Sequence, residues 1–147
     1  MDLVLWRHCE AAPGVPDEAR PLTPRGVAQA KAMATWLAHR LPQDCRILVS
    51  AALRAQQTAR ALGRDFETTA DVGTATTVQT LLDAAGWPDA GEDVLVVGHQ
   101  PTLGEVASLL LGGEAGGRSV GTGGVLWLSS ARDGSADLKV AIAPDPG

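Results

Sequence analysis

Three short, uninterrupted apolar segments alternate along the chain with segments of helical periodicity, and this alternation is the feature that most constrains the fold. The apolar segments cover residues 3–6, 47–49 and 94–97. Such runs are typical of strands that are buried on both faces, as in a parallel sheet with helices on either side. The sequence therefore predicts an α/β fold.

The intervening segments carry the start and stop signals of helices. Thr23 is a predicted N-cap with Pro24 at the first helical position, and Pro42 is expected to end this helix. Its apolar face is expected to comprise Val27, Ala30, Ala34, Leu37 and Leu41. Further helices are predicted over residues 52–62, 78–85 and 101–110, each followed by glycine.

The remaining strands complete the expected sheet. A weak strand is predicted near Phe66, and residues 125–129 and 138–142 are predicted to form two strands joined through Asp133-Gly134. The glycine-rich stretch 112–124 is interpreted as a loop, because the segment after it is too short to fold alone. We expect one domain over residues 1–147, a three-layer α/β/α sandwich with a mainly parallel, mixed central sheet.

Composition and charge restrict the function. The net charge of −5 argues against a surface for nucleic acid or anionic membranes. Cys9 and Cys45 form no Cys-x-x-Cys pair, which fits a reducing compartment without a disulfide framework. The N-terminus lacks the pattern of a signal peptide, and no apolar run approaches membrane-spanning length. We therefore expect a cytoplasmic protein.

Basic and imidazole side chains follow the three strongest predicted strands. Arg7-His8 comes after the first strand, Ser50 to Arg54 after the second, and Gly98-His99 after the third. Ligands of open α/β sheets bind beyond the carboxyl ends of the strands, so these groups are expected to meet at one rim. Arg20, in the preceding loop, could reach the same pocket. Arginines suit a phosphate group, and like charge nearby would keep a histidine neutral and nucleophilic.

The same residues lie in three segments that resemble the motifs of one family. Residues 5–8, Leu-Trp-Arg-His, resemble the Arg-His-Gly signature of the histidine phosphatase (phosphoglycerate mutase-like) superfamily. Residues 50–59 resemble its Ser-Pro-x-x-Arg-Ala-x-Gln-Thr segment, and residues 97–101 its second-histidine motif. The short chain and residues 20–23, Arg-Pro-Leu-Thr, are similar to the SixA-type phosphohistidine phosphatases within it. Three motifs in order, over residues 2–112, are far more specific than one.

The resemblance implies a phosphoglycerate mutase-like fold and a covalent mechanism that uses neither metal nor cofactor. His8 would be the nucleophile that accepts the phosphoryl group. Arg7, Arg54 and His99 would bind the phosphate and take part in catalysis, and Arg20 would assist in phosphate binding. Water would then hydrolyse the phosphohistidine.

The sequence departs from the family pattern at two small residues. Cys9 and Ala51 stand where the family usually has glycine and proline, changes that we expect the site to tolerate. Cys9 is not expected to be the nucleophile of a cysteine phosphatase, because the arginine that such a loop needs six residues on is Val15. The adjacent residues 8–10 lack the spacing of a zinc site.

The identity of a general acid is left open. Larger members of the family carry an acidic proton donor after the second helix, where this chain has Glu67, Asp71 and Asp83, none of them in a matching motif. Glu10 is a further candidate. A leaving alkoxide needs a proton donor, whereas an imidazole leaving from phosphohistidine needs one less. The absent donor thus favours a P–N substrate.

Three functions are consistent with these residues. The favoured one is the dephosphorylation of phosphohistidine on a protein, such as a histidine phosphotransfer domain of a signalling relay. The alternative is a phosphatase of a small phosphomonoester, which an acid in the pocket would favour. A non-catalytic phosphate-binding module is the least favoured, because the matched catalytic positions are intact. The sequence does not indicate the oligomeric state or a regulatory role.

Overall fold

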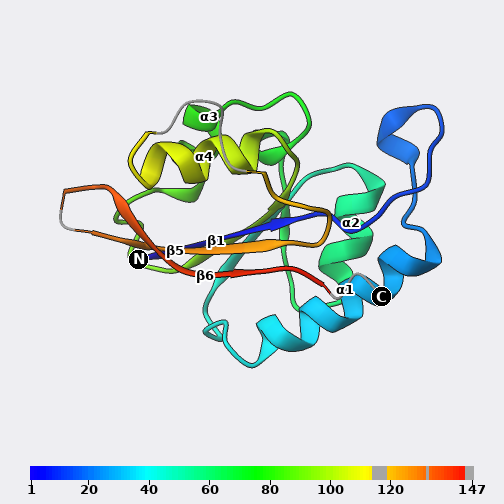
Figure 1. Cartoon of the computed structure of the whole chain (residues 1–147), viewed down its shortest axis with the longest axis horizontal. Coiled ribbons are helices and arrows are strands. Elements are labelled where there is room, and N and C mark those ends of the chain that lie inside the picture. The colour runs from blue at the N-terminus through cyan, green and yellow to red at the C-terminus, as the bar shows by residue number, and fades with distance from the viewer. Residues whose placement is uncertain (114–118, 132, 145–147) are drawn as a thin grey trace.

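The computed structural model of the protein describes residues 1–113, 119–131 and 133–144. In chain order its elements are β1 (Asp2–Arg7), η1 (Asp17–Ala19), α1 (Pro24–Ala38), β2 (Arg46–Val49), α2 (Leu53–Arg60), β3 (Glu67–Thr68), η2 (Ala70–Val72), α3 (Val78–Ala85), β4 (Val94–Gly98), α4 (Thr102–Leu110), β5 (Val125–Ser130) and β6 (Ala136–Ile142), where η marks a short 3-10 helix. The predicted alternation of strands and helices is confirmed (Figure 1).

The strands form one mixed sheet in the order β3-β2-β4-β1-β5-β6. The first four strands of this order pair in parallel, whereas β5 pairs antiparallel with β1, and β6 antiparallel with β5. The parallel pairs put the carboxyl ends of β1, β2 and β4 at the same edge of the sheet. The predicted mainly parallel sheet with an antiparallel pair at its end is therefore confirmed.

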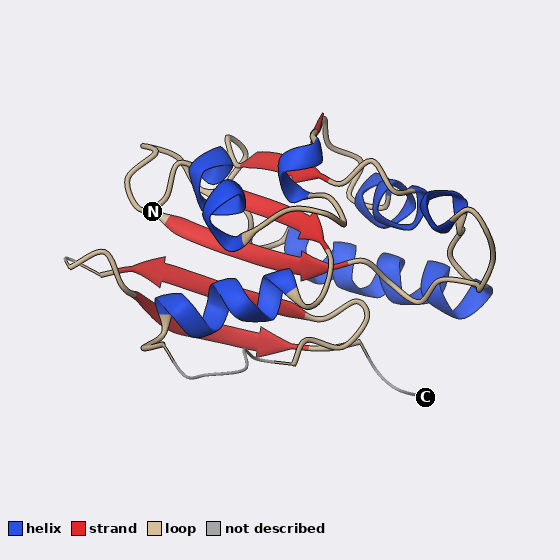
Figure 2. Cartoon of the chain, turned by 90° about the horizontal axis from the view of Figure 1, so that it is seen from above, coloured by secondary structure: helices blue, strands red, loops and turns tan. Residues whose placement is uncertain are grey.

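Helices cover both faces of the sheet and give three layers (Figures 1 and 2). On one face α3 and α4 pack against side chains such as Leu3, Leu5 and Val96. On the other face α1 and α2 pack against the alternate side chains, such as Val4 and Trp6. Because successive residues of a strand point to opposite faces, each central strand contributes to both apolar cores. This explains why these strands appear in the sequence as continuous apolar runs.

The first helix begins as predicted and ends earlier. The Thr23 hydroxyl caps α1 by accepting a hydrogen bond from the Gly26 N–H, but the last helical residue is Ala38 rather than a residue next to Pro42. Arg64 holds the segment that follows the helix, because its guanidinium donates to the carbonyls of Leu41 and Pro42 and, at 3.5 Å, to that of Ala38. Leu41 still packs into the core from the loop that follows.

Other boundaries also differ from the prediction. Val27 is 43% exposed, so the buried face of α1 does not include it. The helices predicted to begin at Ala52 and Pro101 begin one residue later, with those two residues as their N-caps. Of the predicted glycine-rich loop 112–124, residues 114–118 lie outside the described residues.

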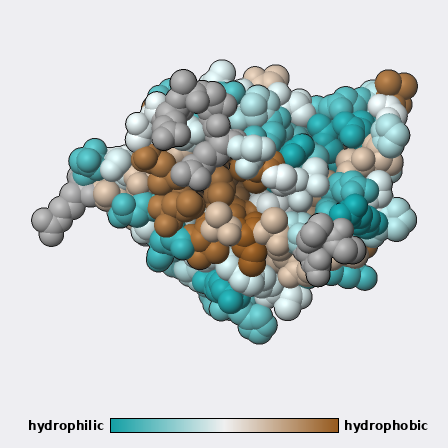
Figure 3. Space-filling model, viewed as in Figure 1, coloured by the Kyte–Doolittle hydropathy of each residue, from teal (hydrophilic) through white to brown (hydrophobic). Residues whose placement is uncertain are grey.

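Hydrophobic side chains gather on one surface over β5 and β6 (Figure 3). Val120, Leu126 and Ile142 line a shallow cavity of about 210 Å³ there.

The described helices are all too short or too polar to cross a membrane.

Candidate active site

The register of the central strands brings the two histidines together. Arg7 on β1 is paired with Gly98 on β4, so that His8 and His99 follow directly at the ends of neighbouring strands. The His8 N–H donates to the carbonyl of Gly98 at 3.0 Å, which continues the pairing one residue beyond the strand. The two imidazole rings have centroids 5.2 Å apart. Ser50, which follows strand β2, lies at the same edge, because the Ser50 N–H donates a hydrogen bond to the carbonyl of Val97.

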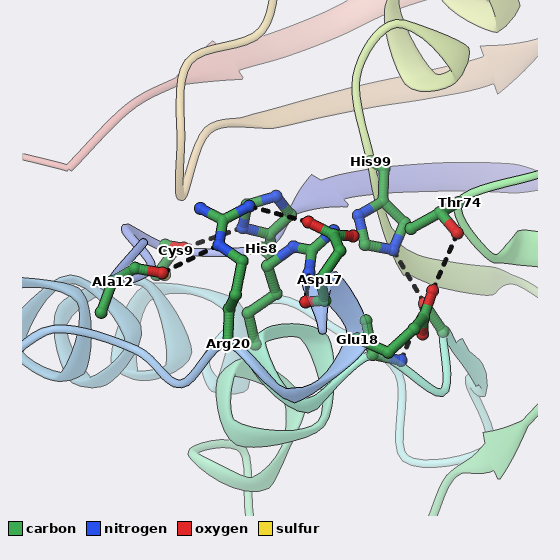
Figure 4. Close-up of polar contacts among 11 residues, drawn as sticks. His8, Cys9, Ala12, Asp17, Glu18, Arg20, Thr74 and His99 are labelled. Carbon is green, nitrogen blue, oxygen red and sulfur yellow. Dashed lines mark hydrogen bonds and ion pairs between the residues drawn. The ribbon is translucent and has the colours of Figure 1, made fainter. Parts of the chain in front are cut away.

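A cavity of about 400 Å³ lies at this edge of the sheet. All five residues that the sequence placed in the site line it: Arg7, His8, Arg20, Arg54 and His99. The other lining residues are Glu10, Ala11, Asp17, Thr74, Gln100 and Thr122. The expected convergence of cations and imidazoles at one rim is therefore what the structure contains (Figure 4).

The environment of His8 fixes which nitrogen is free to react. Its Nδ1 lies 2.8 Å from the carbonyl oxygen of Cys9, and a carbonyl can only accept, so Nδ1 carries the hydrogen. In the neutral ring Nε2 then holds the lone pair. Burial, followed by the charges of His99, Arg54 and Arg7, lowers the pKa of His8 from 6.5 to about 4. At neutral pH the ring is therefore an uncharged base with a free Nε2.

One ring nitrogen of His99 has a hydrogen-bond partner, and the other has none within the described residues. Its Nε2 lies 2.8 Å from the hydroxyl oxygen of Ser50. Its Nδ1 is buried and has no hydrogen-bond partner within the described residues. In Figure 4 this nitrogen lies on the side of the ring that faces His8 and Asp17. Burial, followed by the charge of Arg54, lowers the pKa of His99 to about 4, so this ring is also neutral at pH 7.

The two inner arginines are each anchored by one edge of the guanidinium. Arg54 is only 5% exposed, and its Nη1 and Nη2 donate to the backbone carbonyl and the carboxylate of Asp17 at 2.9 and 3.0 Å. Arg7 donates through Nη1 to the carbonyl of Val120 at 2.9 Å. In both residues Nε is buried without a partner. Each arginine therefore keeps the edge that carries its Nε–H available for an acceptor.

Arg20 lies at the outer rim of the cavity. Its Nε donates to the carbonyl of Ala12 at 2.8 Å, and its Nη1 donates to the carboxylate of Asp17 at 3.0 Å. The side chain is 29% exposed, so it is closer to solvent than Arg54. The structure thus connects Arg20 to Arg54 through the carboxylate of Asp17, and Figure 4 shows the contact between Arg20 and Asp17.

Asp17 is the site residue that the sequence analysis missed. Hydrogen bonds from Arg20 and Arg54 lower the pKa of its carboxyl group, which is therefore ionised at neutral pH. Glu18, next to it, accepts a hydrogen bond from the Thr74 hydroxyl at 2.9 Å, and this links the η1 loop to the segment after η2. The available sequence signal was the three-residue spacing of Asp17 and Arg20, which by itself indicates an ordinary surface pair.

The acids considered as proton donors lie elsewhere or are engaged. Glu67 pairs with Arg46 at 2.9 Å on the neighbouring strand, and neither Glu67 nor Asp71 nor Asp83 lines the cavity. Glu10 does line the cavity. Its carboxylate accepts from the Thr23 hydroxyl at 3.0 Å and faces Arg25 at 3.8 Å.

The second motif also builds the scaffold behind the site. The buried Thr58 hydroxyl accepts from the Cys9 N–H at 3.0 Å and donates to the carbonyl of Arg54 at 2.8 Å. Thr58 thereby fixes the backbone after His8 relative to the helix that carries Arg54. Cys9 packs against Leu22 in a small apolar cluster, and burial raises its pKa to about 11. A thiol in this state is a packing group.

Fold and site together define an α/β protein with a pocket lined by paired histidines and arginines at the carboxyl edge of its sheet. Among the described residues, no group of three His, Cys, Asp or Glu side chains is arranged to hold a metal ion. Residues 3–77 match the sequence profile of the histidine phosphatase superfamily, branch 1. The chain belongs to this superfamily, and it is accordingly a hydrolase of the phosphatase type.

Within the superfamily the chain is similar to SixA phosphatases in both sequence and structure. The phosphohistidine phosphatase SixA of Escherichia coli K12 is 32% identical over 124 residues, which cover 78% of this chain and 76% of that protein. An uncharacterised protein of Mycobacterium tuberculosis is 34% identical over 111 residues, 71% of this chain and 68% of its own. A solved structure of the protein histidine phosphatase SixA with tungstate matches with a TM-score of 0.86 at 26% identity, covering 98% of this chain and 97% of that one.

Proposed function

We propose that the chain hydrolyses phosphohistidine on a protein, with His8 as the nucleophile. The observation that carries the proposal is that the three buried side-chain nitrogens without a partner in the described residues all belong to this cavity: Arg7 Nε, Arg54 Nε and His99 Nδ1. A buried polar group without a partner costs roughly 1–3 kcal/mol, and the two guanidinium Nε–H groups can only donate, so this cavity indicates a ligand rich in acceptors. A phosphoryl group supplies three acceptor oxygens with negative charge.

The chemistry then runs in two displacements. The Nε2 lone pair of His8 attacks phosphorus of a substrate phosphohistidine that carries a proton on its other ring nitrogen, and the P–N bond breaks so that the substrate ring leaves as neutral imidazole. The Nε–H groups of Arg7 and Arg54 stabilise the charge on the phosphoryl oxygens. Water attacks the phosphohistidine of the enzyme in the second step, which releases inorganic phosphate and restores His8.

Neither carboxylate of the cavity is available as a proton donor, and this favours a substrate whose leaving group is a nitrogen atom. Asp17 is bound to two arginines with a lowered pKa, so it does not hold a proton to give. Glu10 is engaged by Thr23 and Arg25. A departing alkoxide would need a proton from such a group, whereas an imidazole is a better leaving group at neutral pH. The E. coli relative is a phosphohistidine phosphatase, which agrees with this preference.

The test is phosphate release from a phosphohistidine-containing phosphotransfer domain, together with trapping of the phosphoenzyme. Wild type should release phosphate and form an acid-labile, base-stable phosphoenzyme, and His8→Ala should do neither. His39→Ala is the matched control, because His39 is an exposed histidine at the end of α1. Equal phosphate release by wild type and His8→Ala would refute the proposal. Phosphate binding without any phosphoenzyme would instead support a non-catalytic binding module.

A small phosphomonoester is the second candidate substrate. The observation in its favour is that Glu10 lines the cavity and so provides a carboxyl group there, which an alkoxide leaving group needs as a proton donor. Turnover of an alkyl phosphate should be compared with that of a phosphoramidate of similar size. A higher kcat/KM for the phosphoramidate supports the first proposal, and the reverse order supports the second.

A further inference from the structure

Ser50 contacts the site through His99 and does not itself line the cavity. It follows β2 directly and is only 1% exposed. Its Oγ accepts a hydrogen bond from the Ala52 N–H at 3.2 Å and lies 2.8 Å from Nε2 of His99. A hydroxyl carries one hydrogen, and this one is buried, so the direction of the bond to His99 follows from counting donors and acceptors.

A neutral His99 has two tautomers, with the ring hydrogen on either Nε2 or Nδ1. If Nε2 carried the hydrogen, it would donate to Ser50, and both the Ser50 hydroxyl hydrogen and the Nδ1 lone pair would lack a partner within the described residues. If Nδ1 carries the hydrogen, Ser50 donates to Nε2 and each atom of the bond is satisfied. Only the Nδ1–H then remains, and it is a donor that faces the cavity (Figure 4).

The second arrangement also agrees with the neighbouring arginines. The unpartnered nitrogens of Arg7 and Arg54 are both N–H donors, since guanidinium nitrogens do not accept. A third donor at His99 makes the cavity uniformly suited to an anion, whereas a lone pair at that position would repel a phosphoryl oxygen. The chain of bonds from the Ala52 N–H through Ser50 to His99 polarises each member toward the cavity.

We propose that Ser50 is a positioning residue that holds His99 in the Nδ1–H tautomer, so that His99 donates a hydrogen bond to the bound phosphoryl group as a neutral imidazole. The assignment of a phosphoryl ligand rests on the function proposed above, but the tautomer does not. Ser50 acts through His99 and has no contact of its own with the reacting atoms.

The experiment is ¹⁵N NMR of the histidine ring nitrogens in the full chain at neutral pH, with and without saturating inorganic phosphate. In wild type, His99 should show a protonated Nδ1 and an unprotonated, hydrogen-bonded Nε2 in both conditions. His39→Gln and His8→Asn serve to assign the three histidines. A hydrogen on Nε2 of His99 in wild type, alone or together with one on Nδ1, would overturn the proposal.

Variants at Ser50 test whether the hydroxyl is the cause. In Ser50→Ala the ring of His99 should populate both tautomers, and kcat/KM should fall about tenfold. Ser50→Thr keeps a hydroxyl group and should restore the Nδ1–H signal of His99. Ser108→Ala, which changes another buried serine on α4, should leave both readouts unchanged. An unchanged His99 spectrum in Ser50→Ala would refute the positioning role. Because the spectrum needs no turnover, a chain with the expected tautomer but no phosphatase activity would overturn the proposed function alone.

Discussion

The carboxylate of Asp17 lies 3.0 Å from Nη2 of Arg54, and the carbonyl oxygen of Asp17 lies 2.9 Å from Nη1 of the same guanidinium. One residue of a loop thus holds the outer edge of an arginine that is almost completely buried. The Nε–H of Arg54 has no partner in the described residues, and Arg54 is one of the residues that line the cavity. Asp17 thus holds Arg54 in place and leaves its Nε–H without a partner in the described residues, as the proposed binding of a phosphoryl group requires.

Replacement of Asp17 by asparagine tests this orientation. Asp17→Asn keeps the backbone carbonyl but weakens the charged bond to Arg54, so we expect kcat/KM for a phosphoramidate to fall about tenfold. Steady-state kinetics of Asp17→Asn and Asp17→Glu would measure the change, with a smaller loss in the glutamate variant. Asp83→Asn, at a residue of α3 outside the cavity, is the control. Equal kinetics of Asp17→Asn and wild type would exclude the orienting role.

The low pKa of His8 predicts the acid limit of activity. The ring must be unprotonated at Nε2 to attack, and its pKa of about 4 lies well below the ordinary 6.5. Activity should therefore be retained as pH falls from 7 to 5 and should be lost only as pH falls through the region of 4. The acid limb of log kcat/KM against pH, corrected for spontaneous hydrolysis of the substrate, reports in the free enzyme the titration of His8 together with His99, whose pKa is also about 4. A limb centred near pH 6.5 would contradict the prediction.

Thr58 provides a prediction for stability. In Thr58→Val the fully buried hydroxyl is replaced by a methyl group of similar size, which leaves the Cys9 N–H without its acceptor. The expected loss in the free energy of unfolding is roughly 1–3 kcal/mol, measured by urea denaturation. Thr35→Val is the control, because Thr35 is exposed on α1 and only donates to the carbonyl of Lys31. Its effect should stay within about 0.5 kcal/mol.

The fold was predictable because the strands are buried on both faces and carry little else than aliphatic side chains. The rim of the site followed from one topological rule, since residues after neighbouring parallel strands must meet at one edge. The path of the chain after α1 was not predictable, because Arg64, which comes more than twenty residues later in the chain, holds it by donating to the carbonyls of Leu41 and Pro42. Local signals cannot show such a partner.

Two features of the site that the sequence left undetermined, the role of Asp17 and the position of Glu67, share this cause. Asp17 lies in a proline-rich loop, and its role depends on a contact with Arg54, 37 residues away. Glu67 was a candidate acid by its position in the chain, but it lies on the edge strand β3 and is engaged by Arg46 on β2. In both cases the partner is set by tertiary packing, whereas the motif residues are set by the strand ends.

Gly26, in the first turn of α1, shows how tightly the segment after His8 is packed against this helix. A Cβ atom built on Gly26 would lie 2.1 Å from the carbonyl oxygen of Glu10, a backbone atom that cannot move alone. That carbonyl also accepts a hydrogen bond from the N–H of Thr23, the N-cap residue. Any larger residue at position 26 must therefore push Glu10 and the cavity wall away from the helix.

The expected result for Gly26→Ala is a loss of about 3 kcal/mol or more in the free energy of unfolding, accompanied by lower activity of the remaining folded protein because Glu10 lines the cavity. Thermal and urea denaturation would measure the stability, and phosphoramidate turnover the activity. Gly121→Ala is the matched control, because a Cβ atom there would meet nothing within 4 Å. If Gly26→Ala were as stable and as active as Gly121→Ala, the packing of α1 against Glu10 would not position this wall of the site.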